Sequence, residues 1–383
     1  MRIGIVGGGH AGTEAAKAAR QAGADTVVVY SGEVVPPYSR PRLVALAFQQ
    51  AAADELWLKP AAWYAANGIE LRLATPVTGV RPATGEIEAA GVWETYDAVV
   101  LANGAAPIRP VVTGSEGALL PLWSYDQALA VRDRFQPGDT LLVLGGGILG
   151  VEAALRAAGA GLKPILVEKC PGLMPTQFTA AAGTVLRTLL EQRGVTVRTG
   201  VSLTAAMPAQ AAGQWRYQLD DGSAVEARAA ILSIGARPAL ELARHAGLPV
   251  DRGVVVTDTL LAGGRVFAAG DITQFAGSTR CSVREALGQG KVAGANAAAA
   301  AAAAGKPLQL YRYQPAPLQF AFNEIVLCSA GDPGVAGDAE LETLAAPPAA
   351  YRALVRRATR LAGVQMIGTK QDFDQYVRQL ASA

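Results

Sequence analysis

The sequence predicts an α/β protein with two parallel β-sheets, and two similar glycine-rich stretches carry this prediction. The first, Gly7–Gly12, follows the apolar run Ile3–Val6, and the second, Gly145–Gly150, follows Leu141–Leu144. Both read G-x-G-x-x-G, a spacing typical of a tight strand-to-helix turn that binds the pyrophosphate of a dinucleotide. One such motif is weak evidence because glycine-rich turns are common. Two of them, about one domain length apart, predict two dinucleotides on one chain, which is the layout of an enzyme that passes electrons between cofactors.

A strand–helix–strand unit is expected around each glycine stretch. In the first unit, the small residues of Ala11–Ala22 predict a helix and Val27–Tyr30 predicts the next strand. In the second unit, Gly150–Ala160 and Pro164–Glu168 have the same pattern. Strands joined by helices run parallel, so two three-layer, Rossmann-like domains are expected.

Further strands and hairpins set the expected domain boundaries. Gln214–Leu219 and Ala224–Ala227 flank an Asp-Asp-Gly turn and predict a hairpin within the second domain. Val266–Ala269 has no partner there, so we expect the chain to return to the first domain at this strand. Short strands, proline-rich loops and a final helix near Gln371–Leu380 predict a small α+β domain at the end of the chain. The expected domains are 1–107 with 237–305, then 108–236, and finally 306–383.

Composition excludes several classes of function. The net charge of +2 and pI near 8.4 are too mild for a general nucleic-acid binder. Cys170, Cys281 and Cys328 form no C-x-x-C pair, and with only two histidines no metal site is expected. The alanine tract Ala297–Ala304 is too short to span a bilayer. The first expected strand begins at residue 2 and leaves no room for a cleaved signal peptide, so we expect a cytoplasmic protein without membrane contact.

Acidic residues after the second strand of each unit predict which dinucleotide is bound. Glu168 follows Ile165–Val167, where a carboxylate accepts hydrogen bonds from a ribose 2′-hydroxyl and repels a 2′-phosphate. The second site is therefore expected to prefer NADH, although the adjacent Lys169 weakens the argument. In the first unit the earliest acid is Glu33, which can contact a ribose only if the strand continues past Tyr30.

A third acidic residue and a predicted helix start point toward the first nucleotide. Asp271 follows the strand Val266–Ala269, where its carboxylate would lie beside that nucleotide. Ser282 and Glu285 have the spacing of a capping box, which predicts a helix beginning there. We expect both side chains to act as ordinary caps, while the backbone of that helix directs positive charge at an anionic group.

These segments together resemble the FAD-dependent pyridine nucleotide-disulfide oxidoreductase superfamily, in the branch without a redox disulfide. Within it, the chain is similar to the NADH:rubredoxin and NADH:flavorubredoxin reductases over residues 1 to about 300. The segments that carry the resemblance include the two glycine stretches, Pro37–Leu43, Trp123–Asp126, Ile234–Pro238, Arg252–Val256 and Ala269–Asp271.

The resemblance implies a role for individual positions. It places FAD at the first glycine stretch and NADH at the second, with Glu152 near the nicotinamide and Arg40 near the flavin. No cysteine precedes Arg40, which argues against peroxidase or thiol chemistry on that loop. No side chain is certain as an acid or base, since the flavin itself carries the hydride chemistry. The implied FAD ligands are Gly7, Gly9, Gly12, Glu33, Arg40, Pro41, Val77, Asn103, Gly104, Gly270 and Asp271, and the implied NADH ligands are Gly145, Gly147, Gly150, Glu152, Glu168 and Gly235.

The resemblance also implies an electron acceptor. It predicts a small acidic carrier protein of the rubredoxin type, which docks on basic residues near the flavin. Arg40 and Arg42 are candidates, and Arg352 and Arg356 could join them, although these two also read as a solvated face. Two alternatives stay open: an NADH oxidase that reduces oxygen directly, and a non-enzymatic flavoprotein that senses NADH.

Overall fold

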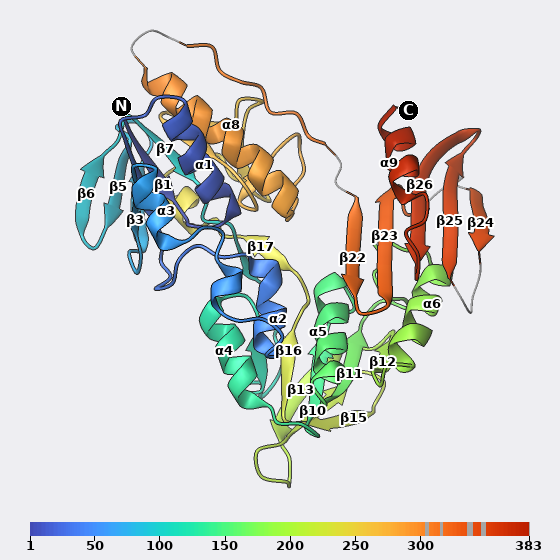
Figure 1. Ribbon diagram of the computed structural model, residues 1–383. Coiled ribbons are helices and arrows are strands. Elements are labelled where there is room, and N and C mark those ends of the chain that lie inside the picture. Colours follow the sequence, from blue (N-terminus) through green and yellow to red (C-terminus); the bar gives the residue numbers. More distant parts are fainter. Residues whose placement is uncertain (303–305, 315–316, 335–339, 346–349, 383) are drawn as a thin grey trace. The chain divides into compact units, whose positions relative to one another are not determined.

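The computed structural model describes residues 1–302, 306–314, 317–334, 340–345 and 350–382 of the chain. These residues divide into two compact units (Figure 1). Unit 1 contains Met1–Arg42, Ala52–Ala106 and Ala236–Gln314, and unit 2 contains Leu43–Ala51, Pro107–Gly235 and Pro315–Ala383. The mixed α/β architecture with parallel sheets confirms the predicted fold class, whereas the predicted functional domain boundaries stay a prediction.

Unit 1 is built on a six-stranded sheet of order β19-β20-β7-β1-β2-β3. All its neighbours are parallel except β19 and β20. The central strands β7 and β20 are fully buried apolar runs, and β1 and β2 are buried except at their first residue, as expected for a parallel sheet covered on both faces. The sheet strands are β1 (Arg2–Val6), β2 (Thr26–Tyr30), β3 (Ile69–Arg72), β7 (Ala98–Leu101), β19 (Leu261–Gly263) and β20 (Val266–Ala268). The smaller strands are β4 (Val77–Arg81), β5 (Glu86–Ala89), β6 (Val92–Thr95), β18 (Val254–Val255) and β21 (Thr273–Gln274), and the helices are α1 (His10–Gln21), α3 (Ala61–Ala66), α7 (Glu241–His245), α8 (Val283–Ala301) and the 3-10 turns Arg40–Arg42 and Asp54–Leu56.

Helices α1 and α8 lie side by side in this unit (Figure 1), and glycines in α8 permit the close approach. A Cβ atom on Gly290 would lie 2.4 Å from the carbonyl oxygen of Ala11, and one on Gly294 would lie 2.1 Å from that of Ala15. Only glycine fits at such a backbone contact. The first half of α1 is therefore held against the middle of α8.

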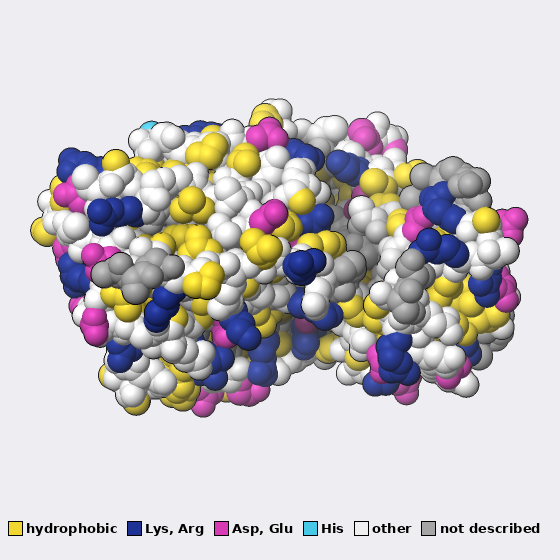
Figure 2. Space-filling model, turned by 90° about the horizontal axis from the view of Figure 1, so that it is seen from above, with side chains coloured by type: hydrophobic (Ala, Val, Ile, Leu, Met, Phe, Trp, Pro, Cys, Tyr) yellow, Lys and Arg dark blue, Asp and Glu magenta, His cyan; other side chains and the backbone are white. Residues whose placement is uncertain are grey.

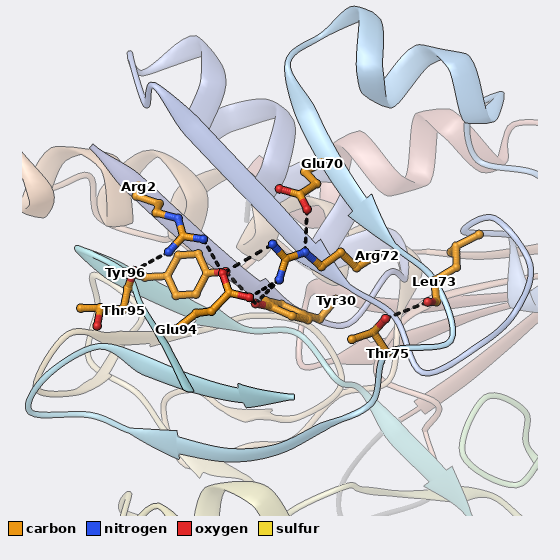
Figure 3. Close-up of polar contacts among 9 residues, drawn as sticks. All are labelled: Arg2, Tyr30, Glu70, Arg72, Leu73, Thr75, Glu94, Thr95 and Tyr96. Atoms are coloured by element: carbon orange, nitrogen blue, oxygen red, sulfur yellow. Dashed lines mark hydrogen bonds and ion pairs between the residues drawn. The ribbon is translucent and has the colours of Figure 1, made fainter. Parts of the chain in front are cut away.

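The three-stranded sheet β4-β5-β6 covers another face of the parallel sheet. Successive side chains on a strand point to opposite faces of the sheet. Ile5 therefore lies on the α1 side, whereas a Cβ on Gly4 would meet Ile87 of β5 and Tyr96, the residue after β6. Arg2 and Arg72 form ion pairs with Glu94 at this junction (Figure 3). The hydroxyls of Tyr30 and Tyr96 lie 2.7 Å apart within the same cluster. The end of β2, next to the first glycine loop, is thus fixed by a polar network.

Unit 2 contains a second parallel sheet of order β12-β11-β10-β16-β9, in which all neighbours are parallel. The predicted hairpin is present as antiparallel β14 and β15. The strands are β9 (Leu119–Pro121), β10 (Thr140–Leu144), β11 (Lys163–Glu168), β12 (Thr196–Thr199), β13 (Leu203–Pro208), β14 (Trp215–Leu219), β15 (Ala224–Ala227) and β16 (Ala229–Leu232), and the helices are α2 (Leu43–Ala47), α4 (Tyr125–Arg134), α5 (Ile148–Gly159) and α6 (Ala180–Glu191). A separate two-stranded sheet is formed by β8 (Ala105–Pro107) and β17 (Ala236–Pro238).

The last part of unit 2 is an antiparallel sheet of order β22-β23-β26-β25-β24 with one helix packed on it. Its core includes Cys328, Val364, Met366 and Phe373, all nearly inaccessible to solvent. The elements are β22 (Leu318–Phe322), β23 (Ile325–Gly331), β24 (Glu340–Ala345), β25 (Tyr351–Arg357), β26 (Arg360–Ile367) and α9 (Phe373–Ser382). This part matches the predicted α+β tail, including the final helix. No helix in the described ranges has the length and apolar character needed to cross a bilayer.

Candidate dinucleotide-binding sites

The first glycine loop joins β1 to α1 with a backbone that only glycine permits. Gly7 has φ of +110°, and a Cβ there would lie 2.3 Å from the carbonyl oxygen of Ala102. A Cβ on Gly12 would lie 1.8 Å from the carbonyl oxygen of Gly7. At Gly9, by contrast, a Cβ would meet nothing within 4 Å. Gly7 and Gly12 are therefore required by the fold, whereas the open space at Gly9 is suited to a ligand.

The second loop, between β10 and α5, repeats this geometry in unit 2. Gly145 has φ of +106°, and a Cβ there would lie 2.3 Å from the carbonyl oxygen of Ser233. A Cβ on Gly150 would lie 1.9 Å from the carbonyl oxygen of Gly145, and one on Gly147 would meet nothing within 4 Å. The predicted turns are thus present at both positions, each at the N-terminus of a 12-residue helix.

A cavity of about 450 Å³ opens beside the first loop, within unit 1. Its volume lies in the range typical of small-molecule sites. The lining includes five of the predicted FAD ligands: Gly7, Glu33, Arg40, Val77 and Asn103.

Glu33 and Arg40 are paired in this cavity. Arg40 donates from Nη2 to Oε1 of Glu33 (2.8 Å), and the Tyr38 hydroxyl donates to Oε2 (2.6 Å). Strand β2 ends at Tyr30, so Glu33 reaches the cavity from the following turn and not from an extended strand. The Glu33 carboxylate therefore accepts a charge-assisted hydrogen bond from Arg40 and a short one from Tyr38, and the two bonds fix its orientation.

Asn103 lies at the mouth of the turn after β7, in the same cavity. Its Nδ2 donates to the carbonyl oxygen of Ala239 (2.9 Å), which fixes the side chain. Its Oδ1 is buried and has no hydrogen-bond partner. Buried polar atoms normally have a hydrogen-bond partner, so Asn103 Oδ1 is an acceptor for a donor group of a bound ligand. Gly104 follows with φ of +70°.

Asp271 lies at the N-terminus of α8, beyond the turn at Gly270. A Cβ on Gly270 would lie 2.9 Å from that of Ala11 in the first turn of α1, so Asp271 is close to the first glycine loop. Burial raises the pKa of Asp271, and Arg40 and the Ser282 N–H counteract that rise. Asp271 is therefore close to the first turn of α1 and to the N-terminus of α8, while its contact with a nucleotide stays a prediction.

The capping box predicted at α8 is only half formed. The Ser282 hydroxyl accepts from the Glu285 N–H at 3.5 Å. The return bond from Glu285 to Ser282 is absent, because the Ser282 N–H is directed to Asp271. Oε1 of Glu285 is buried without a hydrogen-bond partner. The prediction that Glu285 acts as an ordinary cap is therefore wrong.

Glu168 connects β11 to the second glycine loop. It is 8% exposed, and its Oε2 accepts from the Gly146 N–H (2.6 Å) while its Oε1 accepts from the Cys170 N–H (2.7 Å). A carboxylate held by two backbone donors has a fixed direction. It is placed beside the loop where a ribose hydroxyl would reach it.

Glu152 lies one turn into α5 and is paired within its own helix. Arg156 donates from Nε to Oε1 of Glu152 (2.7 Å) and from Nη1 to Oε1 of Gln50 (2.7 Å). Burial raises the pKa of Glu152, and Arg156 lowers it. The carboxylate is therefore a buried, charge-compensated group. Near the same loop, Ser233 Oγ is buried and unpartnered, a site residue that the sequence did not suggest.

The remaining predicted residues lie in the expected segments. Pro41 belongs to the short 3-10 turn that begins at Arg40, and Gly235 has φ of +99° directly after β16. Ser31 and Tyr38 were not predicted but contribute to the first site, because apolar-strand patterns do not indicate the residues that follow a strand end. Within the described part of the chain, no three His, Cys, Asp or Glu side chains could hold a metal ion.

The residues present fit two dinucleotides. At each loop an open space lies over the middle glycine, a helix N-terminus supplies N–H donors, and a buried oxygen (Asn103 Oδ1 or Ser233 Oγ) lacks a partner. Such features are typical of proteins that bind dinucleotides. A family model described as "Pyridine nucleotide-disulphide oxidoreductase" matches residues 1–304. The chain belongs to this family and is an NAD(P)H-dependent flavin oxidoreductase.

Individual relatives narrow the comparison. The chain is 34% identical over 276 residues to the rubredoxin-NAD(+) reductase of Pseudomonas putida, covering 71% of each protein. It is 31% identical, with the same coverage, to the nitric oxide reductase FlRd-NAD(+) reductase of Aeromonas hydrophila. It is 32% identical to the benzene 1,2-dioxygenase ferredoxin–NAD(+) reductase subunit of Pseudomonas putida, covering 70% of this chain and 66% of that protein.

Solved structures show the same fold. The putidaredoxin reductase–putidaredoxin complex matches with a TM-score of 0.88 and 24% identity, over 100% of this chain and 93% of that one. The NADH:rubredoxin oxidoreductase of Clostridium acetobutylicum matches with a TM-score of 0.83 and 23% identity, over 100% and 95%. A water-forming NADH oxidase from Lactobacillus brevis matches with a TM-score of 0.86 and 20% identity, over 99% and 91%. The fold is therefore shared by reductases of redox proteins and by oxidases.

Proposed function

We propose that this protein accepts electrons from NADH on an FAD bound in unit 1 and passes them to a small acidic redox protein of the rubredoxin type. The observation that carries the proposal is the pair of glycine loops with matching backbone geometry and different acidic neighbours. The family relatives that are most similar in sequence include reductases named for rubredoxin, flavorubredoxin and ferredoxin carriers.

FAD is assigned to the first loop because its cavity contains cationic and hydrogen-bonding groups as well as the glycine turn. Gly9 leaves room for the pyrophosphate, Glu33 can accept from the ribose, and Arg40 neutralises negative charge in the same cavity. Asn103 Oδ1 is available for a donor of the cofactor. Asp271 would accept from the polyol chain of the flavin. A bound flavin would supply the hydride acceptor and the step from two electrons to single electrons.

NADH is assigned to the second loop because of Glu168. Its buried, backbone-held carboxylate can accept from a 2′-hydroxyl and disfavours the extra negative charge of a 2′-phosphate. Glu152, with Arg156, would border the nicotinamide. These residues position the donor and contribute no proton to the hydride transfer.

The residues suggested for carrier docking are already paired within the chain. Arg42 binds Glu55 (2.8 Å), Arg356 binds Glu342 (2.7 Å) and Arg352 binds Asp372 (3.3 Å). Figure 2 shows acidic side chains interspersed with basic ones over the face it presents. Such a mixed surface supports weak, transient docking, so charge should affect the association rate more than the affinity.

The test follows electrons from donor to acceptor without oxygen. The purified protein is mixed with NADH or NADPH in a stopped-flow instrument, and rubredoxin, a [2Fe–2S] ferredoxin or oxygen is then added. We expect NADH to reduce the flavin faster than NADPH, and rubredoxin to be reduced faster than oxygen. Added salt should slow the rubredoxin step while flavin reduction hardly changes.

Two outcomes contradict parts of this proposal. The proposed carrier protein is ruled out if electron transfer to rubredoxin is insensitive to salt and no faster than transfer to oxygen. The protein would then be proposed to act as an NADH oxidase, an activity found in a protein of the same fold. Equal flavin reduction by NADH and NADPH removes Glu168 from its proposed role.

A further inference from the structure

Glu285 is a buried carboxylate that lacks the partners such a group normally has. Its residue is 4% exposed, and its Oε1 makes no hydrogen bond. The nearest ion-pair partner is Arg280, whose Nη1 lies 3.8 Å from Oε1, beyond hydrogen-bond distance. Leaving a buried charge this poorly compensated destabilises the folded chain, so its presence calls for an explanation.

The lack of a partner follows from how the N-terminus of α8 is capped. In a complete capping box the third helical residue accepts from the backbone N–H of the cap residue. Here the Ser282 N–H serves Asp271, and Glu285 is left without that donor. Asp271 therefore takes the bond that would otherwise hold Glu285 to the helix end.

The groups that face Glu285 come from three segments. Arg280, stacked at 4.0 Å on the ring of Tyr313, is the cationic neighbour, and Asp271 is the anionic one. Burial raises the pKa of Glu285; Arg280 lowers it and Asp271 raises it further. Burial also raises the pKa of Cys281, to about 12, and that of Tyr311, so both stay neutral.

Glu285 is also close to the first glycine loop. The next residue, Ala286, lies 3.7 Å from the position of a Cβ on Gly270, and that same position is 2.9 Å from Ala11 of α1. One turn later, Gly290 contacts the backbone of Ala11. The first turn of α8, which carries Glu285, is therefore near the first turn of α1, and Asp271 in the same region acts electrostatically on the Glu285 carboxylate. The backbone of this helix start directs positive charge toward an anionic group of the proposed cofactor.

From this geometry we infer that Glu285 takes up a proton when the cofactor in unit 1 is reduced, and so adds to the pH dependence that the reduction potential of a flavin already has. The inference rests on the proposed FAD site. It identifies Glu285 as a positioning residue of that site, acting through its charge.

The proton balance is simple. Hydride transfer from NADH leaves NAD⁺ and adds one negative charge to the cofactor. That charge and the Glu285 carboxylate compete for the same helix N-terminus, so the carboxylate accepts one proton from solvent and becomes neutral. When the electrons leave, the proton returns to solvent.

The first test measures the midpoint potential of the bound flavin from pH 5 to 9 in the parent protein and in Glu285→Gln. We expect equal potentials at low pH and a higher potential in the variant at high pH, with the gap widening as pH rises. Asp258→Asn, which removes an exposed acid of the same unit, should give a profile parallel to that of the parent. Parallel profiles for the parent and Glu285→Gln would overturn the inference while leaving the FAD assignment intact; a protein that binds no flavin overturns both.

Three further measurements do not depend on turnover. Infrared difference spectra between the reduced and oxidised protein should contain a band from a protonated carboxyl group, and this band should be missing in Glu285→Gln. In Arg280→Gln, the pH range over which the reduction potential changes should shift to higher pH. In flavin-free protein, the pKa of Glu285 is raised in the folded state, so its ionised form destabilises the fold at pH above that pKa. The melting temperature of Glu285→Gln relative to the parent should therefore rise from pH 4 to 8. A constant difference, or an unchanged infrared band, contradicts the inference.

Discussion

The two glycine loops have the same backbone geometry and differ in the side chain at the end of the neighbouring strand, β2 for the first loop and β11 for the second. The Gly7 N–H donates to the carbonyl oxygen of Tyr30, and the Gly145 N–H donates to that of Val167, each at 2.8 Å. Ser31 therefore occupies in the first site the position of Glu168 in the second. The contacts agree, since a Cβ on Gly8 would meet Ser31 as one on Gly146 would meet Glu168.

This difference separates the two proposed ligands. In the second site the carboxylate binds the loop directly, whereas in the first a small serine occupies that place and Glu33 lies two residues later, tied to Tyr38 and Arg40. The first site also has the N-terminus of α8, with Asp271, beside its loop. The two loops thus have the same turn for binding phosphate, and we expect the residues around each turn to select FAD or NADH.

The largest effects are expected where a Cβ would collide with the loop itself. Gly12→Ala places a methyl group 1.8 Å from the carbonyl oxygen of Gly7, and Gly150→Ala repeats this at 1.9 Å from that of Gly145. We expect Gly12→Ala to purify without flavin, and Gly150→Ala to keep flavin but to lose reduction by NADH. Absorbance at 450 nm and anaerobic kinetics measure both. Loss of flavin from both variants would contradict the separation of the two sites.

Glu168→Gln should have the next largest effect, since it removes a buried charge held by two backbone donors. We expect a loss of about 1–3 kcal/mol in unfolding free energy and a roughly ten-fold smaller preference for NADH over NADPH. Ser31→Ala, the matched change in the first site, should leave the nucleotide preference unchanged. Steady-state kinetics with both nucleotides decide the matter, and an unaltered ratio in Glu168→Gln would refute the role of the carboxylate.

Asp271→Asn tests what is particular to the first site. Removing a charged acceptor is expected to weaken FAD retention by about 1.5–3 kcal/mol, ten- to a hundred-fold in dissociation constant. Titration of the flavin-free protein with FAD measures this, with Asp258→Asn as the control. An unchanged dissociation constant would place Asp271 away from the cofactor.

The smallest effect concerns the network that holds the end of β2 (Figure 3). Hydrogen bonds from Arg72 lower the pKa of Glu94 to about 2, despite its partial burial. A lowered folded-state pKa stabilises the fold above the unfolded value near 4.5, and this stabilisation is lost as pH falls toward 2. Because the side chain of Glu94 is 26% exposed, solvent screening reduces the effect to about 1–2 kcal/mol.

Glu94→Gln should therefore be less stable than the parent at pH 7 in denaturant titrations, and this difference in unfolding free energy should shrink as pH falls from 4.5 toward 2. Glu226→Gln, from an exposed ion pair with Arg216, should change the unfolding free energy by less than about 0.5 kcal/mol. If the deficit of Glu94→Gln is independent of pH, the ion pairs with Arg2 and Arg72 are not its cause.

Much of the fold could be predicted because it depends on local patterns. The strands before Gly7 and Gly145, the helices after them and the final helix lie within a few residues of their predicted bounds. The proximity of Asp271 to the first loop could be inferred because parallel strands end at one edge of a sheet.

Other features could not be predicted because they depend on contacts between distant segments. The spacing of Ser282 and Glu285 predicts a capping box, but Asp271 competes for the Ser282 N–H and breaks it. The pairs of Arg352 and Arg356 with acids on neighbouring elements are likewise invisible in the sequence.

The most direct test of two sites for two different dinucleotides uses Gly9→Ala and Gly147→Ala. A methyl group at either position meets no protein atom within 4 Å, so the fold should be unaffected and any loss reports on the ligand. Flavin content and the rate of anaerobic reduction by NADH are measured for both variants. The account predicts that Gly9→Ala loses FAD, whereas Gly147→Ala retains it and is reduced slowly even at high NADH. Full flavin and normal reduction in Gly9→Ala, or loss of flavin from Gly147→Ala, would contradict it.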